Sequence, residues 1–146
     1  MCLTIPKAEK VRRISNAFPD LDLCERTREI SRHYEGCQVN ICLNYGGRDE
    51  LVRAAMAYAQ DCQAGRADPH QLSQAQFGAY LFSKGVPDPD LVIRPSGEVR
   101  LSNFLLWQSA YAEFYFTDVL WPDFSKDELL RAIAVYQHRN RRYGGV

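Results

Sequence analysis

Two arginines and a serine in one short segment have the side chains that bind phosphate. Arg94 follows the apolar residues 91–93, a turn is expected at residues 95–97, and Arg100 and Ser102 come next. Guanidinium groups form paired hydrogen bonds with phosphate oxygens, and a helix beginning at Ser102 would add free N–H groups and positive dipole potential. We therefore predict a phosphate or diphosphate site. The alternative is a surface ion-pair cluster with a serine helix cap, because both features are common.

Hydrophobic periodicity predicts strands and helices in alternation around this segment. The alternation is typical of an α/β fold with a mostly parallel sheet flanked by helices. Ligands of such sheets bind beyond the carboxyl ends of strands, where Arg94 is expected. We expect strands at residues 11–15, 39–43, 91–93 and 113–117, and helices between Asp20 and Gly36, from about Asp49 to Gly65, from Ser73 to Gly85, from Ser102, and from Ser125 to about Arg139.

Capping signals and apolar spacing define two of these helices further. A serine followed three residues later by Gln or Glu forms a capping box, as in Ser73 with Gln76 and Ser125 with Glu128. The helix from Asp49 is expected to turn a regular apolar face inward, and the last helix has apolar residues at helical spacing. These positions are Val52, Ala55, Met56, Ala59 and Cys62 in the first, and Leu129, Leu130, Ile133 and Tyr136 in the second.

Composition predicts one globular domain without a bulk electrostatic partner. The chain has 146 residues, 46% of them hydrophobic and 25% charged, and 18 basic residues balance 18 acidic ones. A neutral balance argues against nucleic acid as a partner. Five cysteines without a Cys-x-x-Cys pair indicate free thiols in the cytoplasm. No apolar run reaches the roughly 18 to 20 residues of a membrane-spanning helix, so at most peripheral membrane contact is expected.

Residues 94–108, RPSGEVRLSNFLLWQ, resemble the C-terminal signature of the cis-prenyltransferases, the undecaprenyl diphosphate synthase or isoprenyl transferase family. The signature is an arginine, a Gly-Gly-Glu or Ser-Gly-Glu turn, a second arginine, and Ser-Asn-Phe-Leu-Leu-Trp-Gln. The resemblance runs from about residue 11 to the end. It implies a partial, Rossmann-like cis-prenyltransferase fold, with residues 1–10 as a tail and residues 11–146 as the C-terminal portion of the domain. Bacterial relatives have Thr-Gly where this chain has Pro95-Ser96, which stiffens the turn.

The resemblance also implies a role for each matching residue. Arg94, Arg100 and Ser102 match the residues that bind the diphosphate of isopentenyl diphosphate. Glu113 matches a glutamate that helps to bind Mg²⁺ across a dimer; its alternative role is a solvated carboxylate at a strand edge. The Arg142-x-Gly144 motif matches one that reaches into the partner subunit's substrate site; the alternative role of Arg142 is that of a simple helix-end cation. Residues 44–48 are interpreted as a structural turn between a strand and a helix.

One motif of the family is absent from this sequence, and its absence shapes the functional hypothesis. The family's Asp-Gly-Asn aspartate handles the allylic diphosphate, and the chain contains no such tripeptide and therefore no candidate catalytic residue. The resemblance implies a Mg²⁺-dependent prenyltransferase subunit that binds isopentenyl diphosphate. A second subunit carrying Asp-Gly-Asn would supply the allylic site in a heteromer; a homodimer is the alternative assembly. The alternative is a non-catalytic accessory subunit that stabilises a partner prenyltransferase.

Overall fold

The computed structural model describes residues 26, 29–33 and 38–139, which belong to two units, Met1–Tyr45 and Gly46–Val146. In the first unit, residues 26 and 29–31 are helical, within the helix expected between Asp20 and Gly36. The strand expected at residues 39–43 is reduced to a single bridge at Asn40. A parallel strand depends on paired neighbours rather than on its own residues, so an apolar run alone does not form one. The strand expected at residues 11–15 lies outside the described residues.

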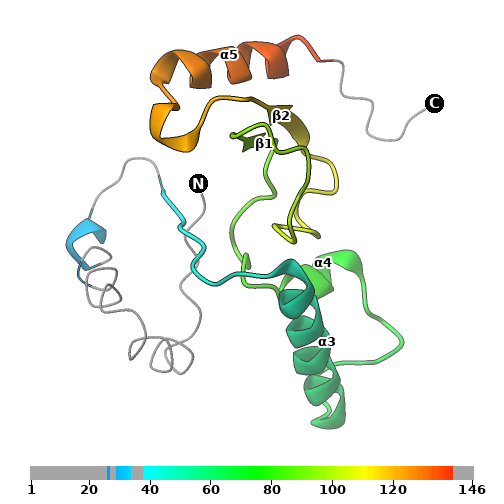
Figure 1. Cartoon of the computed structure of the whole chain (residues 1–146). Coiled ribbons are helices and arrows are strands. Elements are labelled where there is room, and N and C mark those ends of the chain that lie inside the picture. The colour runs from blue at the N-terminus through cyan, green and yellow to red at the C-terminus, as the bar shows by residue number, and fades with distance from the viewer. Residues whose placement is uncertain (1–25, 27–28, 34–37, 140–146) are drawn as a thin grey trace. The chain divides into compact units, whose positions relative to one another are not determined.

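The sheet of the second unit consists of two parallel strands, β1 (Leu91–Arg94) and β2 (Glu113–Phe116) (Figure 1). Leu91 lies opposite Glu113, and Arg94 lies opposite Phe116. Both strands occur where hydrophobic patterning predicts them. Parallel strands require a crossover connection, and residues 95–112 provide it. The helices and the parallel pairing confirm the predicted α/β class.

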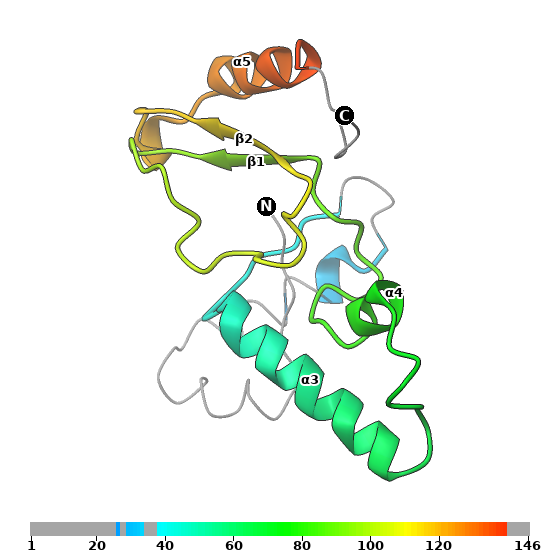
Figure 2. The ribbon, with the colours of Figure 1, turned by 90° about the vertical axis from the view of Figure 1, so that its right-hand side faces the viewer.

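The two faces of this sheet carry different residues because side chains alternate along a strand. The register places Arg94 and Phe116 on one face and Glu113 and Tyr115 on the other. The second face is covered by α5 (Lys126–Gln137), which runs alongside the strands in Figure 2. The Tyr115 hydroxyl donates a hydrogen bond of 2.9 Å to the Glu128 carboxylate of α5. The Arg94 face is thus the face that α5 leaves open.

Helix α5 begins with half of the predicted capping box. The Ser125 hydroxyl accepts a hydrogen bond from the Glu128 N–H at 3.3 Å. The Glu128 side chain does not return to the cap; it accepts hydrogen bonds from Tyr115 and from Thr117, the latter at 2.8 Å. Tyr115 of β2 and Thr117, which follows β2, therefore bind the carboxylate that was predicted to complete the helix cap. Between β2 and α5 the chain forms a short 3-10 helix at Trp121–Asp123.

Helices α3 (Gly47–Gln63) and α4 (Gln74–Gly78) pack against each other, below the strands in Figure 2. The predicted capping box of α4 is complete: Gln76 N–H donates to the Ser73 hydroxyl, and Gln76 Oε1 accepts from the Ser73 N–H. The helix ends at Gly78, earlier than the expected end at Gly85. Residues 79–85 form successive turns instead. Gly85 has a φ of +81°, which suits a glycine-terminated turn.

The prediction of which face of α3 is buried is wrong. Val52 and Met56 are 60% and 58% exposed, whereas Gly47, Glu50 and Ala54 are buried. The buried face is small and polar because Glu50 forms hydrogen bonds with residues from two other segments. Hydrophobicity therefore pointed to the wrong side of the helix. Apolar residues of α5 are also exposed, among them Leu129, Leu130 and Ile133.

The helix predicted from Ser102 is also absent. Residues 102–111 form consecutive turns and bends. Ser102, Asn103 and Leu105 have φ values of 47°, 64° and 45°, in the left-handed region. Left-handed residues interrupt a right-handed helix, so the local helical pattern is overridden. Within the described residues no helix is long and apolar enough to span a membrane, and Cys62 of α3 is not part of a disulfide.

Candidate functional site

The turn after β1 forms backbone hydrogen bonds with residues 117–119, which follow β2. Thr117 N–H donates to the Arg94 carbonyl at 3.1 Å, which extends the parallel ladder by one bond. The N–H groups of Ser96 and Gly97 then donate to the carbonyls of Val119 and Thr117, both at 2.9 Å. The segment between the two candidate arginines therefore starts from a defined position at the carboxyl end of the sheet.

This turn requires left-handed backbone at two successive residues. Ser96 and Gly97 have φ values of 71° and 69°. Glycine adopts this region freely, whereas serine is strained there. A side chain at Gly97 would also lie 3.0 Å from the Asp118 carboxylate. The turn predicted at residues 95–97 is thus confirmed, and Gly97 is required by both its backbone conformation and its surroundings.

The three predicted diphosphate ligands are brought together. Arg94 Nη2 donates a long hydrogen bond of 3.4 Å to the Ser102 hydroxyl. Arg94 and Arg100 both line one cavity of about 190 Å³. The other lining residues are apolar, and the rings of Phe114 and Phe116 stack with centroids 6.0 Å apart. The cavity is lined by Val92, Ile93, Arg94, Arg100, Leu101, Phe104, Phe114 and Phe116.

A carboxylate accompanies one of the two cations. Arg100 forms an ion pair with Glu98, two residues earlier in the same loop, and the Arg100 side chain is 65% exposed. The Glu98 side chain is 33% exposed, so the pair is open to solvent on the arginine side only. The exposed guanidinium group is therefore accessible to an anion with several negative charges. The cavity combines two cationic groups with an apolar wall, which suits an amphiphilic phosphate ester.

Glu113 does not join Arg94 and Arg100 at the cavity of its own chain. It lies at the start of β2 opposite Leu91, three residues from the Arg94 end, which corresponds to about 10 Å along a strand. It also lies on the other face of the sheet, where Arg139 Nη1 donates to Glu113 Oε2 at 2.7 Å. If Glu113 binds magnesium next to these arginines, the arginines must belong to a neighbouring chain.

The described residues provide few ligands for a magnesium ion. No group of three or more His, Cys, Asp or Glu side chains in this part of the chain is arranged to hold a metal. Mg²⁺ commonly keeps several waters and binds one or two carboxylates together with substrate phosphates. A single carboxylate such as Glu113 fits that mode and does not fit a cage made of protein ligands alone. Arg142 and Gly144 lie outside the described residues and stay predictions.

A buried polar network that joins α3 to residues 82, 83 and 108 was not predicted from the sequence. Glu50 of α3 is 1% exposed, and its carboxylate accepts hydrogen bonds from the Phe82 N–H at 2.7 Å and from Gln108 Nε2 at 3.1 Å. Gln108 Nε2 also donates to the Ser83 hydroxyl at 2.9 Å. The network ties α3 to the turn segment that carries Ser102. No periodic signal marks these polar residues in the sequence.

Asn103 is a second unpredicted residue, and a glycine pair marks its position. Its carbonyl and side chain both accept hydrogen bonds from the first N–H groups of α3. A Cβ atom at Gly47 would lie 2.8 Å from Leu106 Cγ, and one at Gly46 would lie 3.0 Å from Asn103 Nδ2. The Gly-Gly dipeptide was interpreted as a turn; its close approach to residues 103–106 is an additional reason for it.

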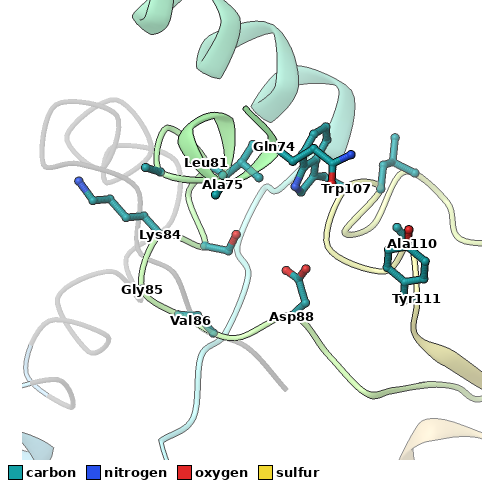
Figure 3. Close-up of a pocket in the computed structure, with 14 residues that line it drawn as sticks. Gln74, Ala75, Leu81, Lys84, Gly85, Val86, Asp88, Trp107, Ala110 and Tyr111 are labelled. Atoms are coloured by element: carbon teal, nitrogen blue, oxygen red, sulfur yellow. The ribbon is translucent and has the colours of Figure 1, made fainter. Parts of the chain in front are cut away.

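The larger cavity of the second unit contains none of the predicted site residues. Its volume is about 640 Å³, and it is bordered by α4 and by residues 81–88 and 106–111 (Figure 3). Lys84, Asp88, Trp107 and Tyr111 are among its lining residues. This cavity is the larger of the two, but the smaller one is lined by the guanidinium groups of Arg94 and Arg100, and Arg94 contacts the Ser102 hydroxyl, which matches the predicted ligand. We therefore take the smaller cavity as the candidate site.

Comparisons with known proteins agree with the resemblance seen in the sequence. The family model of undecaprenyl diphosphate synthases matches residues 13–144. The chain is 51% identical over 130 residues to the isoprenyl transferase of Streptococcus mutans, covering 86% of the chain and 52% of that protein. It is 48% identical to the isoprenyl transferase of Clostridium perfringens, covering 81% and 47%.

A solved structure shows the same similarity in three dimensions. The chain superposes on lavandulyl diphosphate synthase from Lavandula x intermedia, in complex with dimethylallyl diphosphate, with a TM-score of 0.81. The sequence identity is 39%, and the match covers 85% of this chain and 53% of that one. The chain thus spans about half the length of the curated relatives it matches.

Proposed function

The chain belongs to the undecaprenyl diphosphate synthase family of cis-prenyltransferases, and we propose that it supplies the isopentenyl diphosphate site of such an enzyme. The observation that carries the proposal is the convergence of Arg94, Arg100 and Ser102. The two guanidinium groups line one cavity, and the hydroxyl lies 3.4 Å from Arg94 Nη2. No other group of described residues combines these side chains at the carboxyl end of a parallel strand.

The cavity has a polar part and an apolar part, as a phosphorylated five-carbon unit requires. Arg94 and Arg100 would bind diphosphate oxygens through charge-assisted hydrogen bonds, and Ser102 would add one neutral contact. Leu101 and Phe104 would contact the hydrocarbon part. Fixing both ends of the substrate orients its terminal carbon for attack on an allylic diphosphate, which is a positional contribution to the rate.

Glu98 would orient Arg100 before the substrate binds. The ion pair keeps the exposed Arg100 side chain close to the loop. Diphosphate carries more negative charge than a carboxylate, so it would displace or share that interaction. Binding would then strengthen with the charge of the ligand and weaken with salt, because the Arg100 side chain is exposed.

The allylic half of the reaction is proposed to come from a second chain with an Asp-Gly-Asn motif. This chain contains no such motif, and it spans about half the length of its relatives. Its exposed apolar side chains support an additional contact surface: Val52 and Met56 on α3, and Leu130 and Ile133 on α5. Exposed apolar groups of this size are typical of surfaces that another protein covers.

Magnesium is proposed as the cofactor, with Glu113 as its protein ligand among the described residues. The ion would neutralise diphosphate charge. The register and the Arg139 ion pair separate Glu113 from the cavity of its own chain. We therefore propose that Glu113 acts on the site of a neighbouring chain, as Arg142 and Gly144 would.

The test measures the binding of isopentenyl diphosphate and its incorporation by the chain with a partner that carries Asp-Gly-Asn. Arg94→Ala is expected to raise KM for isopentenyl diphosphate at least ~tenfold, and Arg94→Lys is expected to recover only part of that loss, because lysine lacks the paired donors. Arg53→Gln is the control, since Arg53 forms an exposed ion pair with Asp49 on α3 and does not line the cavity.

The same experiment separates this proposal from the accessory-subunit alternative. If Arg94→Ala retains the turnover and substrate affinity of the unmodified complex, the chain acts as a scaffold and the proposed site is wrong. Turnover by this chain alone, with both substrates, would contradict the requirement for a second chain.

A further inference from the structure

We infer that Asn103 is a positioning residue that holds Ser102 at the diphosphate site by fastening its loop to the N-terminus of α3. The inference rests on the proposed function, because it concerns the site of isopentenyl diphosphate. Asn103 itself lines neither cavity. Its effect on the ligand would therefore pass through its neighbour, Ser102.

The attachment consists of two hydrogen bonds to successive N–H groups. Gly47 N–H donates to the Asn103 carbonyl at 2.7 Å, and Arg48 N–H donates to Asn103 Oδ1 at 2.9 Å. The first N–H groups of a helix lack intrahelical partners. The N-cap residue, Gly46, provides no side-chain cap. Asn103, 55 residues farther along the chain than Arg48, performs the function that an N-cap side chain usually performs.

The attachment maintains a backbone conformation that the local sequence does not favour. Ser102 and Asn103 both have left-handed φ values, and asparagine tolerates that region better than most residues, whereas serine does not. The sequence from Ser102 onward has the pattern of a helix. Without the two bonds, the segment would relax towards right-handed backbone, and the Ser102 hydroxyl would move away from Arg94.

Two glycines allow the close approach that these bonds need. Side chains at Gly46 and Gly47 would meet Asn103 and Leu106 at 3.0 and 2.8 Å. The same bonds occupy the first N–H groups of α3, so this helix terminus is engaged by Asn103. The groups that would bind an anion at the site are therefore the two guanidinium groups and the Ser102 hydroxyl, and not the N-terminus of α3.

Three variants of the full chain test the inference. Asn103→Leu removes the side-chain acceptor of the Arg48 N–H with little change in size, and Asn103→Asp keeps an acceptor that a helix N-terminus favours. Tyr80→Phe is the control: it removes a hydrogen bond of 2.8 Å to Asp61, near the other end of α3. Two quantities are measured: hydrogen exchange of the Arg48 amide, and the Kd of isopentenyl diphosphate by calorimetry with the Asp-Gly-Asn partner present.

Asn103→Leu is expected to speed exchange of the Arg48 amide and to raise Kd about tenfold. Asn103→Asp should restore slow exchange and bring Kd to within about threefold of the original, and Tyr80→Phe should change neither. The inference is overturned if Asn103→Leu leaves Kd unchanged, or if Tyr80→Phe raises Kd as much. An unmodified complex that does not bind isopentenyl diphosphate overturns the proposed function as well, so the two failures are distinguishable.

Discussion

The carboxylate of Glu113 is paired with Arg139, whose Nη1 lies 2.7 Å from Glu113 Oε2. This pair lies on the sheet face that α5 covers, and Arg94 lies on the other face. A carboxylate engaged in this way has to leave Arg139, or share it, before it can bind a metal ion.

Arg139→Gln is therefore expected to lower the Mg²⁺ concentration that gives half-maximal activity of the assembled enzyme, because it removes the competitor of the metal. The cost in stability should be small, roughly 0–1 kcal/mol, since the Arg139 side chain is 44% exposed. A magnesium titration of activity checks this. If neither Arg139→Gln nor Glu113→Gln changes the Mg²⁺ concentration at half-maximal activity, Glu113 has a structural role only.

Gln108→Leu is expected to destabilise the chain by about 3 kcal/mol, because it removes a donor from the buried Glu50 carboxylate and adds none. Urea unfolding would measure the change in the free energy of unfolding. Asp49→Asn is the matched control, because Asp49 precedes Glu50 on α3 but is exposed; its effect should stay within about 0.5 kcal/mol. Equal effects of the two substitutions would contradict a structural role for the network.

Gly47→Ala is expected to destabilise by about 2 kcal/mol, although alanine is the better helix former by about 1 kcal/mol. The added methyl group would lie 2.8 Å from Leu106 Cγ and 3.1 Å from the Asn103 carbonyl. Gly78→Ala in α4 is the control, because an added methyl group there would meet no atom within 4 Å apart from its own helix backbone and adjacent residues. Thermal unfolding should show the first variant less stable and the second unchanged or more stable.

Hydrogen bonds from Thr117 and then Tyr115 lower the pKa of Glu128 below its ordinary value of 4.5. The folded state therefore favours the charged carboxylate. This contribution is fully present above the unfolded-state pKa and is lost as the pH falls through the folded-state pKa. The free energy of unfolding should accordingly decline as the pH falls below about 4.5.

Thr117→Val should reduce that acid-dependent loss, and Tyr115→Phe should reduce it less, because the Thr117 bond has the larger effect on the pKa. Urea unfolding at a series of acidic pH values gives the slope for each variant. An unchanged slope in Thr117→Val would show that other carboxylates govern acid unfolding. Asp61 is the first alternative, because hydrogen bonds from Arg66 and Tyr80 lower its pKa as well.

Short-range patterns predicted the elements that depend on their own residues. The Ser73–Gln76 capping box forms as expected, and the two strands around the crossover lie where apolar runs place them. The Arg94, Arg100 and Ser102 cluster was also predicted, because residues so close along the chain stay close after a single turn. Family resemblance suggested the ligand, and comparisons with known proteins confirmed the family.

Predictions failed where distant residues change the local preference. The pattern after Ser102 is helical, but Asn103 bonds the N-terminus of α3 and takes a left-handed conformation. Glu128 was expected to complete a helix cap, but Thr117 and Tyr115 bind its carboxylate. The apolar face of α3 was expected to be buried, but Glu50 and its partners occupy the inner side.

The family, the α/β class and the candidate phosphate-binding side chains can be inferred from the sequence, because they depend on residue types and on spacings of a few residues. Tertiary structure alone decided which sheet face Glu113 occupies, which side of α3 is buried and how the Ser102 loop is held. Each of these depends on contacts between residues far apart in the chain, and a polar contact of that kind leaves no periodic pattern in the sequence.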